Sequence, residues 1–80
     1  MKRRNPIHAK RQLARNLRRL RLDRSWSQDD LAAEANVRQA LVSAMEVTTA
    51  NPTLETLDKV AAALGVGIAE LLAAPPAKSR

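Results

Sequence analysis

The 80-residue chain contains no cysteine, and its only aromatic residue is Trp26. The lack of cysteine excludes disulfide scaffolds, cysteine-ligated zinc, iron–sulfur clusters and thiol catalysis. A single aromatic residue argues against the stacking platforms that bind single-stranded RNA. Two glycines and four prolines leave few helix breakers, and no segment alternates β-branched and aromatic residues as a strand does. The sequence therefore predicts one all-α domain.

No apolar run approaches the roughly 18–20 residues that cross a bilayer. The basic start, Met-Lys-Arg-Arg, is not followed by the apolar segment of a signal peptide. His8 stands without a second histidine or an acidic cluster, and no nucleophile, base and pocket come together. We expect a non-enzymatic protein of the cytoplasm, at the nucleoid, with no membrane partner, no metal and no cofactor.

The net charge of +6 is unevenly distributed. Residues 1–24 hold ten of the fourteen lysines and arginines and one acid, which gives +9. Residues 25–80 hold four basic and seven acidic residues, which gives −3. A basic protein favours a polyanionic partner, and here the basic N-terminal quarter would attract it.

Caps and apolar spacing divide the chain into five helices. The first begins at Asn5-Pro6 and ends near 22–24; the others cover about 28–35, 38–47, 53–64 and 67–73. Ser27 is expected to cap the second helix, Asn36 to end it in the left-handed conformation, and Gly65 to end the fourth. Residues 1–9 are interpreted as a basic arm and the start of the first helix, 10–74 as the domain, and 75–80 as a flexible tail.

Residues 28–47 have the requirements of a helix-turn-helix. Ala32 is small enough for the two helices to cross closely, and Asn36 can adopt the positive φ of the turn. Apolar residues stand at the positions that should be buried, namely Leu31, Ala35, Val37, Val42 and Met45.

The sequence resembles the phage-repressor and Cro-like helix-turn-helix regulators in six segments between residues 17 and 66. The matching segments are LRRLR at 17–21, WSQDDLA at 26–32, NV at 36–37, VSAME at 42–46, NPTLETL at 51–57 and LGV at 64–66. The resemblance implies a five-helix lambda-repressor-like fold that binds double-stranded DNA as a homodimer on an inverted repeat. Asn36 stands where the family prefers glycine, and Val47-Thr48-Thr49 replace a frequent basic residue and glycine, so the following loop is expected to differ in shape.

The outward face of the third helix is small and nearly uncharged, as suits a helix in the major groove. The residues predicted to contact DNA there are Arg38, Gln39, Ala40, Ser43 and Ala44. Gln39 could pair with adenine, the alanines could touch thymine methyls, and Arg38 could reach guanine or a phosphate. An exposed alanine-rich face, or a surface for another protein, is the alternative interpretation.

Gln28 opens the second helix, where the backbone N–H groups favour a phosphate. The resemblance implies that it braces both the DNA backbone and the third helix; a solvent-exposed glutamine is the alternative. Glu46 lies on the apolar side of its helix, where an unpaired carboxylate would be costly. Arg21, at the edge of the first helix's apolar stripe, is its expected structural partner, and the resemblance suggests the same pair.

Lys2, Arg3 and Arg4 are predicted to contact DNA phosphates as an arm. Lys10, Arg11, Arg15, Arg18 and Arg19 could also reach phosphates, or they could form a solvated face. A surplus of apolar residues near the C-terminal end predicts a dimer surface made of Leu64, Ile68, Leu71 and Leu72.

The function predicted is a sequence-specific transcription regulator, a repressor or an activator. Three alternatives stay open on the sequence: an antitoxin-like protein-binding module, a restriction–modification controller, and a nonspecific nucleoid-type DNA binder.

Overall fold

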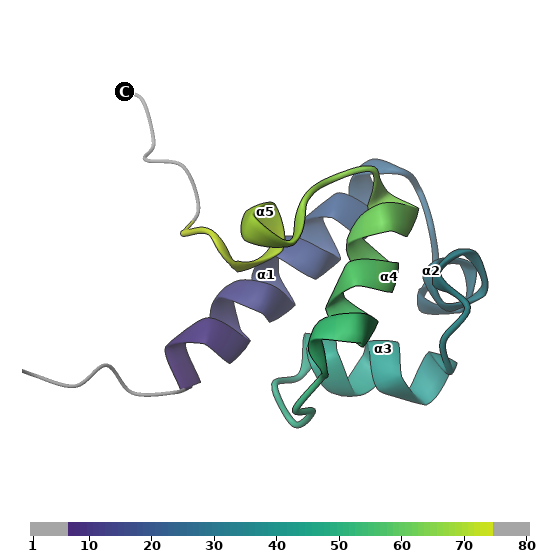
Figure 1. Ribbon diagram of the computed structural model, residues 1–80. Helices are drawn as coiled ribbons and strands as arrows, with labels where there is room; N and C mark the ends of the chain where they lie inside the picture. The colour runs from purple at the N-terminus through teal and green to yellow at the C-terminus, as the bar shows by residue number, and fades with distance from the viewer. Residues whose placement is uncertain (1–6, 75–80) are drawn as a thin grey trace, which may run out of the picture.

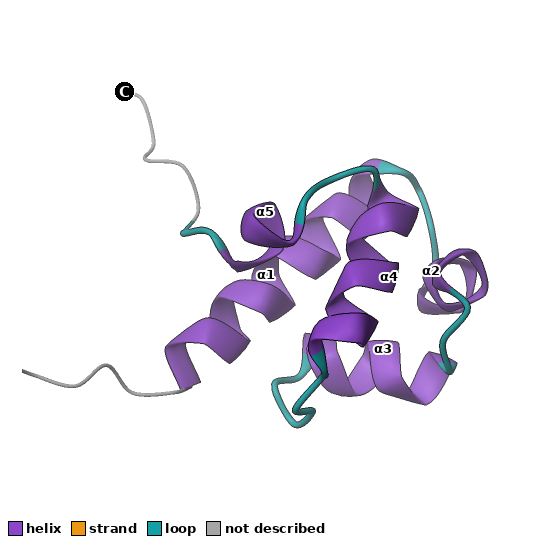
Figure 2. Cartoon of the chain, viewed as in Figure 1, coloured by secondary structure: helices purple, strands orange, loops and turns teal. Residues whose placement is uncertain are grey.

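The computed structural model describes residues 7–74, which form five helices and no strand (Figures 1 and 2). The helices are α1 (Ile7–Asp23), α2 (Gln28–Ala35), α3 (Gln39–Glu46), α4 (Leu54–Leu64) and α5 (Ile68–Leu72). The predicted all-α class and helix order are confirmed. Asn5 and Pro6, the predicted start of the first helix, lie outside the described residues. No helix within 7–74 has the length and apolar character needed to cross a membrane.

The ends of α2 form as the sequence predicts. The Ser27 hydroxyl accepts a hydrogen bond from the Asp30 backbone N–H at 3.0 Å, and the Asp30 carboxylate accepts one from the Ser27 N–H at 2.8 Å. This reciprocal pair is a capping box, which satisfies two otherwise unpaired N–H groups. At the other end Asn36 takes the left-handed conformation, with φ of 57°. These two residues therefore fix where the first helix of the helix-turn-helix begins and ends.

The later helices also end close to the predicted positions. Thr53 caps α4 by accepting from the Thr56 N–H at 3.1 Å, and Gly65 ends it with φ of 72°. The third helix is one residue shorter at each end than expected, because Arg38 and Val47 occupy its cap positions. Arg38 is extended, with φ of −75° and ψ of 143°, and it makes no side-chain cap.

The core lies where the five helices meet (Figure 1). Helix α1 packs against α3 and α5, and α4 packs against α2 and α5. The members of the core from α2 and α3 are buried as expected, namely Leu31, Ala32, Ala35, Val42 and Met45. Val37, expected to be buried, is only partly so, although it packs against this core. The core therefore holds α3 between α1 and α2 and leaves one side of α3 uncovered.

Two of the four residues predicted to form a dimer surface belong to this core. Leu64 and Leu71 have 0% exposure, because both belong to the core that the five helices share, and they have no surface to offer a second subunit. The prediction is wrong for these two residues. Ile68 and Leu72 are only partly buried and keep some accessible surface.

Asn16 fastens α5 to α1. It is buried on the inner side of α1, and its amide nitrogen lies 2.8 Å from the carbonyl oxygens of both Leu71 and Ala73 and 3.3 Å from that of Glu70. A five-residue helix has few internal hydrogen bonds to stabilise it. The C-terminal end of α5 is therefore held by a side chain from the first helix.

Candidate nucleic-acid interface

The uncovered side of α3 carries the residues that were predicted to contact bases. Gln39 and Ala40 are exposed, and Ser43 and Ala44, one turn further on, are half-buried. Val47 follows at the end of the helix with 60% exposure. Apart from Gln39, these side chains are short, so the backbone of α3 can come close to a surface that docks against it. The structure therefore places the predicted group on one face.

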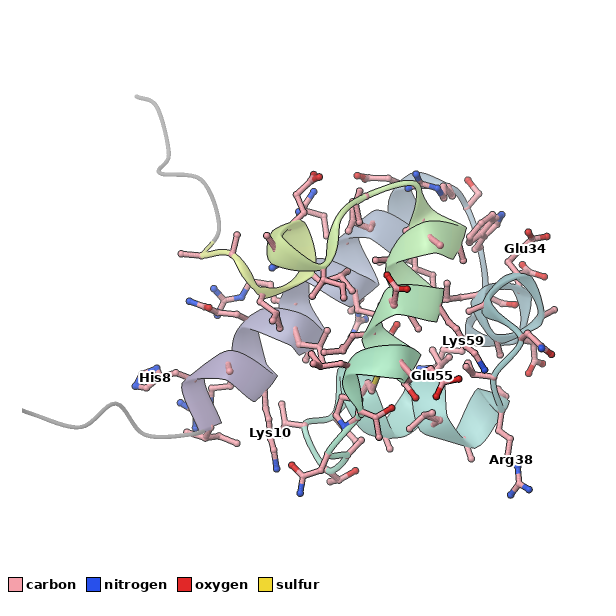
Figure 3. All side chains as sticks on the ribbon, viewed as in Figure 1. His8, Lys10, Glu34, Arg38, Glu55 and Lys59 are labelled. Carbon is pink, nitrogen blue, oxygen red and sulfur yellow. The ribbon has the colours of Figure 1, made fainter. Side chains whose placement is uncertain are left out.

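Arg38 and Gln28 stand at the edge of this face. Arg38 is exposed and precedes α3, and its side chain extends away from the body of the protein (Figure 3). Gln28 is the first residue of α2 and is half-buried. Lys2, Arg3 and Arg4, the predicted arm contacts, lie outside the described residues.

Glu46, on the buried side of α3, forms the predicted ion pair with Arg21. The Arg21 Nε donates to Glu46 Oε2 at 2.7 Å, and Nη2 donates to Oε1 at 2.9 Å. The third guanidinium nitrogen, Nη1, donates to the carbonyl oxygen of Trp26 at 2.8 Å. Only 4% of the Glu46 side chain is exposed. A two-pronged contact of this kind is geometrically specific, so it sets the position of α3 relative to α1.

A chain of hydrogen bonds leads from this ion pair to the outward face. The Gln28 Nε2 donates to Glu46 Oε1 at 3.2 Å, and the Gln28 Oε1 accepts from the Gln39 Nε2 at 2.8 Å. Gln28 thus bridges the buried carboxylate and an exposed side chain of α3. The expectation that Gln28 braces the third helix agrees with these two contacts.

The electrostatics of Glu46 follow from its partners. Burial acts to raise its pKa, but hydrogen bonds from Arg21 and Gln28, together with the charges of Arg21 and Arg18, hold the pKa below its usual value. The hydrogen bond to Glu46 in turn raises the pKa of Arg21. Both groups are charged near neutral pH, and the pair stabilises the domain there.

The exposed side of α1 is rich in positive charge. Arg11, Arg15, Arg18 and Arg19 are all exposed. Within residues 7–74 the ion pairs are Arg21–Glu46 and Lys59–Glu55, so these four arginines have no acidic partner there. The same part of the chain has no cluster of histidine, cysteine, aspartate or glutamate that could hold a metal ion.

Two structural residues of this region were not predicted from the sequence. Asn16 occupies a position on the apolar stripe between Leu13 and Leu20, and a polar residue there was a usable signal. Arg24 donates to the carbonyl oxygens of Leu20 and Leu64 and lies 5.8 Å from the centre of the Trp26 ring. Nothing in the spacing of the sequence indicates that contact between the ends of α1 and α4.

Comparison with known proteins decides what this arrangement is. A family model described as helix-turn-helix, HTH_3, matches residues 17–71, which include all of α2, α3 and α4. The chain belongs to the HTH_3 helix-turn-helix family. This family consists of DNA-binding regulators and not of enzymes, and the resemblance inferred from the sequence is confirmed.

Individual HTH_3 relatives agree with this membership. The chain is 41% identical over 63 residues to a Neisseria hypothetical transcription factor of Neisseria meningitidis serogroup B, covering 79% of this chain and 59% of the relative. A crystal structure described as the hypothetical transcription factor NHTF from Neisseria superposes with a TM-score of 0.81 at 39% identity, covering 84% of this chain and 77% of the other. The chain thus spans only about three-fifths of the length of the curated relative it matches.

Two further crystal structures share the fold. An HTH_3 family transcriptional regulator from Vibrio cholerae has a TM-score of 0.78 at 30% identity, over 84% of this chain and 38% of the other. A restriction–modification controller protein has a TM-score of 0.70 at 24% identity, over 86% of this chain and 90% of the other. At that identity the controller shares the fold alone.

Proposed function

We propose that the protein is a sequence-specific transcription regulator that binds an inverted-repeat operator as a homodimer. Helix α3 of each subunit enters the major groove, and the two half-sites lie about 34 Å apart, one turn of DNA. The regulator works in the cytoplasm, at the nucleoid. It needs no cofactor for this activity, because base edges and phosphates are bound by side chains and backbone alone.

The observation that carries this proposal is the hydrogen bond between Gln28 and Gln39. An exposed glutamine side chain ordinarily samples many rotamers, and fixing it costs conformational entropy on binding. Here Gln28 accepts from the Gln39 Nε2 at 2.8 Å, and Gln28 is itself held by the buried Glu46. The side chain best suited to bidentate contact with adenine is thus pre-positioned on the α3 face.

The distribution of charge supports the same assignment. The α3 face from Gln39 to Ala44 carries no charged side chain, whereas α1 exposes four arginines without acidic partners. Phosphate contacts supply affinity and contacts with base edges supply specificity. We therefore assign attraction of DNA to α1 and the N-terminal arm, including Lys2, Arg3 and Arg4. Discrimination falls to Arg38, Gln39, Ala40, Ser43 and Ala44.

The homodimer is assigned to the partly exposed residues of α5, Ile68 and Leu72. Both pack against the core and retain accessible apolar surface. Leu72 also lines an apolar pocket with Leu13, Pro52 and Leu57, so accessible apolar surface continues beyond α5. A two-fold interface uses the same patch on both subunits, and a continuous apolar patch suits that arrangement.

The test is a comparison of sequence preference in two glutamine variants. The measured quantity is the difference in binding free energy between the best duplex and a scrambled duplex. Gln39→Ala should reduce this difference by about 1–3 kcal/mol per half-site, which is the value of one bidentate base contact. Gln12→Ala is the matched control, because Gln12 lies on α1 and outside the α3 face. Equal preference in the wild type and Gln39→Ala would contradict the assignment of α3 as the reading helix.

A further inference from the structure

The loop that follows α3 carries no charge of its own. Residues 47–53 are Val-Thr-Thr-Ala-Asn-Pro-Thr. Thr48 adopts a positive φ of 63°, and the Thr49 hydroxyl donates to the carbonyl oxygen of Ala44 at 3.3 Å. The loop is therefore folded back on the end of α3, and it can offer a phosphate only neutral hydrogen-bond donors.

The length of α3 brings this loop close to a DNA backbone under the proposed function. An eight-residue helix is about 12 Å long. The major groove is about 12 Å wide. When such a helix reaches across the groove, one phosphate backbone lies near its N-terminal end and the other near its C-terminal end. Arg38 stands at the first end, and the uncharged loop stands at the second.

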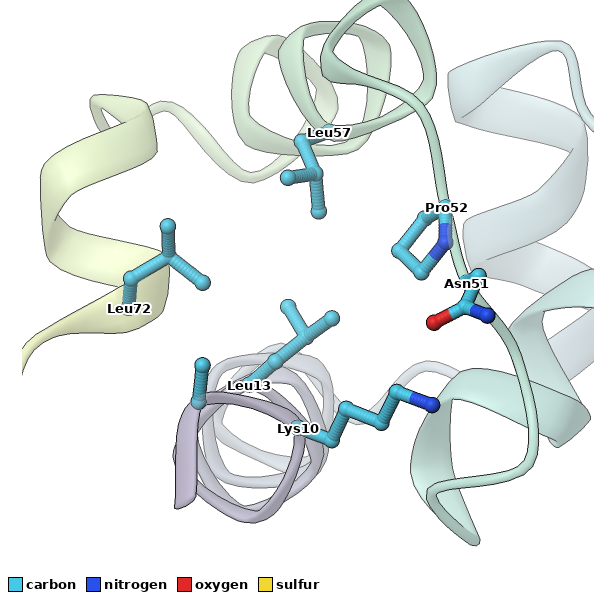
Figure 4. Close-up of a pocket in the computed structure, with 7 residues that line it drawn as sticks. Lys10, Leu13, Asn51, Pro52, Leu57 and Leu72 are labelled. Carbon is cyan, nitrogen blue, oxygen red and sulfur yellow. The ribbon is translucent and has the colours of Figure 1, made fainter. Parts of the chain in front are cut away.

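Lys10 of α1 lies beside this loop. Its side chain lines the apolar pocket together with Asn51 and Pro52 of the loop and Leu13 of α1. Figure 4 shows the stem running along the pocket and the ammonium end directed toward the loop at Asn51. Lys10 is half-buried, as expected when a lysine packs its methylene groups on apolar surface and keeps the charge in water.

The charge of Lys10 is available to a ligand. Within residues 7–74 the ion pairs are Arg21–Glu46 and Lys59–Glu55, so Lys10 has no ion pair with an acidic side chain there. In Figure 3 the side chains of Lys10 and Arg38 extend toward the same side of the molecule. The two cations thus stand near opposite ends of the α3 region: Arg38 is the N-terminal cap of α3, and Lys10 lies beside the loop that follows its C-terminal end.

We propose that Lys10 provides, from α1, the positively charged phosphate contact at the C-terminal end of α3. This inference rests on the proposed function and names a residue that completes it. The packed stem holds the charge at a fixed place relative to α3. The contact therefore contributes affinity and alignment on the duplex, and it contributes nothing to the choice of bases.

The first test is the salt dependence of binding to one duplex, selected from a random pool by the wild type. Each phosphate neutralised contributes about 0.9 to the slope of log K against log salt. Lys10→Met keeps an apolar stem in the pocket and removes the charge, so the slope should fall by about 0.9 per subunit. Both proteins should lose affinity when the salt is raised from 50 to 200 mM. The loss should be about 3–4-fold smaller per subunit for Lys10→Met than for the wild type. Lys10→Arg should restore the wild-type slope.

Lys59→Met is the matched control. Lys59 lies on α4, outside α1 and outside the α3 face, and its replacement is the same substitution and removes the same charge. The change in slope should be clearly smaller than for Lys10→Met. If the wild type binds the duplex and Lys10→Met shows the same salt slope as the wild type, the Lys10 contact is overturned. The proposed function is unaffected by that result. A wild type that binds no duplex would overturn both.

A positional measurement supplies a second readout. The chain has no cysteine, so Lys10→Cys creates a single attachment point for an iron chelate that cleaves nearby DNA. The cuts should fall on the backbone that flanks the C-terminal end of α3, with Lys59→Cys, on α4, giving weaker cleavage or none at those nucleotides. Equal cleavage from the two positions would contradict the proposal.

Discussion

Arg21 holds both carboxylate oxygens of Glu46, at 2.7 and 2.9 Å, and this contact joins the first helix to the helix that carries the outward face. Gln28 binds one of the same oxygens and passes the constraint on to Gln39. A buried structural pair and an exposed side chain proposed to read DNA are thus connected by three hydrogen-bonded contacts. Changes at the pair should affect both stability and the geometry of the α3 face.

Removing one partner of this pair should be costly. Glu46→Ala leaves the Arg21 guanidinium buried without its counter-ion, and such changes cost about 3–5 kcal/mol. Replacing both partners, with Arg21→Met and Glu46→Leu, should recover much of that loss, because neither charge is then buried alone. Urea unfolding of the two variants measures the difference.

Glu55→Ala is the control for the Glu46 variant. The Glu55–Lys59 pair spans 3.9 Å and its glutamate side chain is 80% exposed. Exposed pairs contribute about 0–1 kcal/mol, so this variant should unfold almost as the wild type does. If Glu46→Ala were as mild as Glu55→Ala, the pair would not be what fixes α3.

The stability of the domain should fall on the acid side in a way that depends on Glu46. The folded protein holds the pKa of Glu46 below its usual value. The unfolded value is about 4.3, so this stabilisation is fully present above about pH 4.3 and is lost as the pH falls through the folded pKa. Glu46→Gln should remove this part of the acid transition. The measurement is the urea midpoint of both proteins between pH 5 and pH 2, in about half-unit steps. An identical pH dependence in the wild type and Glu46→Gln would contradict the role of Glu46 in the acid transition.

Asn16→Ala should loosen α5 specifically. The substitution removes the donor that the carbonyl groups of Leu71 and Ala73 share, and unsatisfied buried groups cost about 1–3 kcal/mol. Amide hydrogen exchange should accelerate in α5 more than in α4. Asn51→Ala, at an exposed asparagine, is the control. Uniform acceleration across all helices would indicate a general loss of stability and not a local one.

The dimer surface can be tested by placing a charge at the partly buried Leu72 or at the exposed Leu54. Leu72→Glu should shift the protein toward monomer in sedimentation velocity, because α5 is the assigned interface. Leu54→Glu should leave the association unchanged, although Leu54 is 73% exposed and is the more accessible of the two. Dissociation by Leu54→Glu alone would move the interface to the start of α4.

The ends of several helices could be predicted from the local sequence alone. Ser27, Asn36, Thr53 and Gly65 define helix ends because capping and left-handed backbone depend on the residue itself and its near neighbours. The pairing of Glu46 with Arg21 was predictable for a different reason: a carboxylate on an apolar face requires a partner.

What the sequence did not reveal depends on contacts between distant segments. The apolar surplus near the C-terminal end predicts that Leu64 and Leu71 lie at a surface, yet both are fully buried in the core that the five helices share. The Asn16 contact with the end of α5 spans more than 50 residues of chain. The position of Lys10 beside the loop after α3 likewise appears only once α1 and α4 are packed.

The account as a whole is tested most directly by selecting bound duplexes from a random pool with the wild-type protein. The α3 face, held through Gln39, Gln28 and Glu46, predicts an enriched motif made of two inverted half-sites whose centres lie about 10 base pairs apart. A pool that stays unenriched although duplex is bound, or one enriched for a single half-site without symmetry, would contradict the account of a dimer that reads DNA through α3.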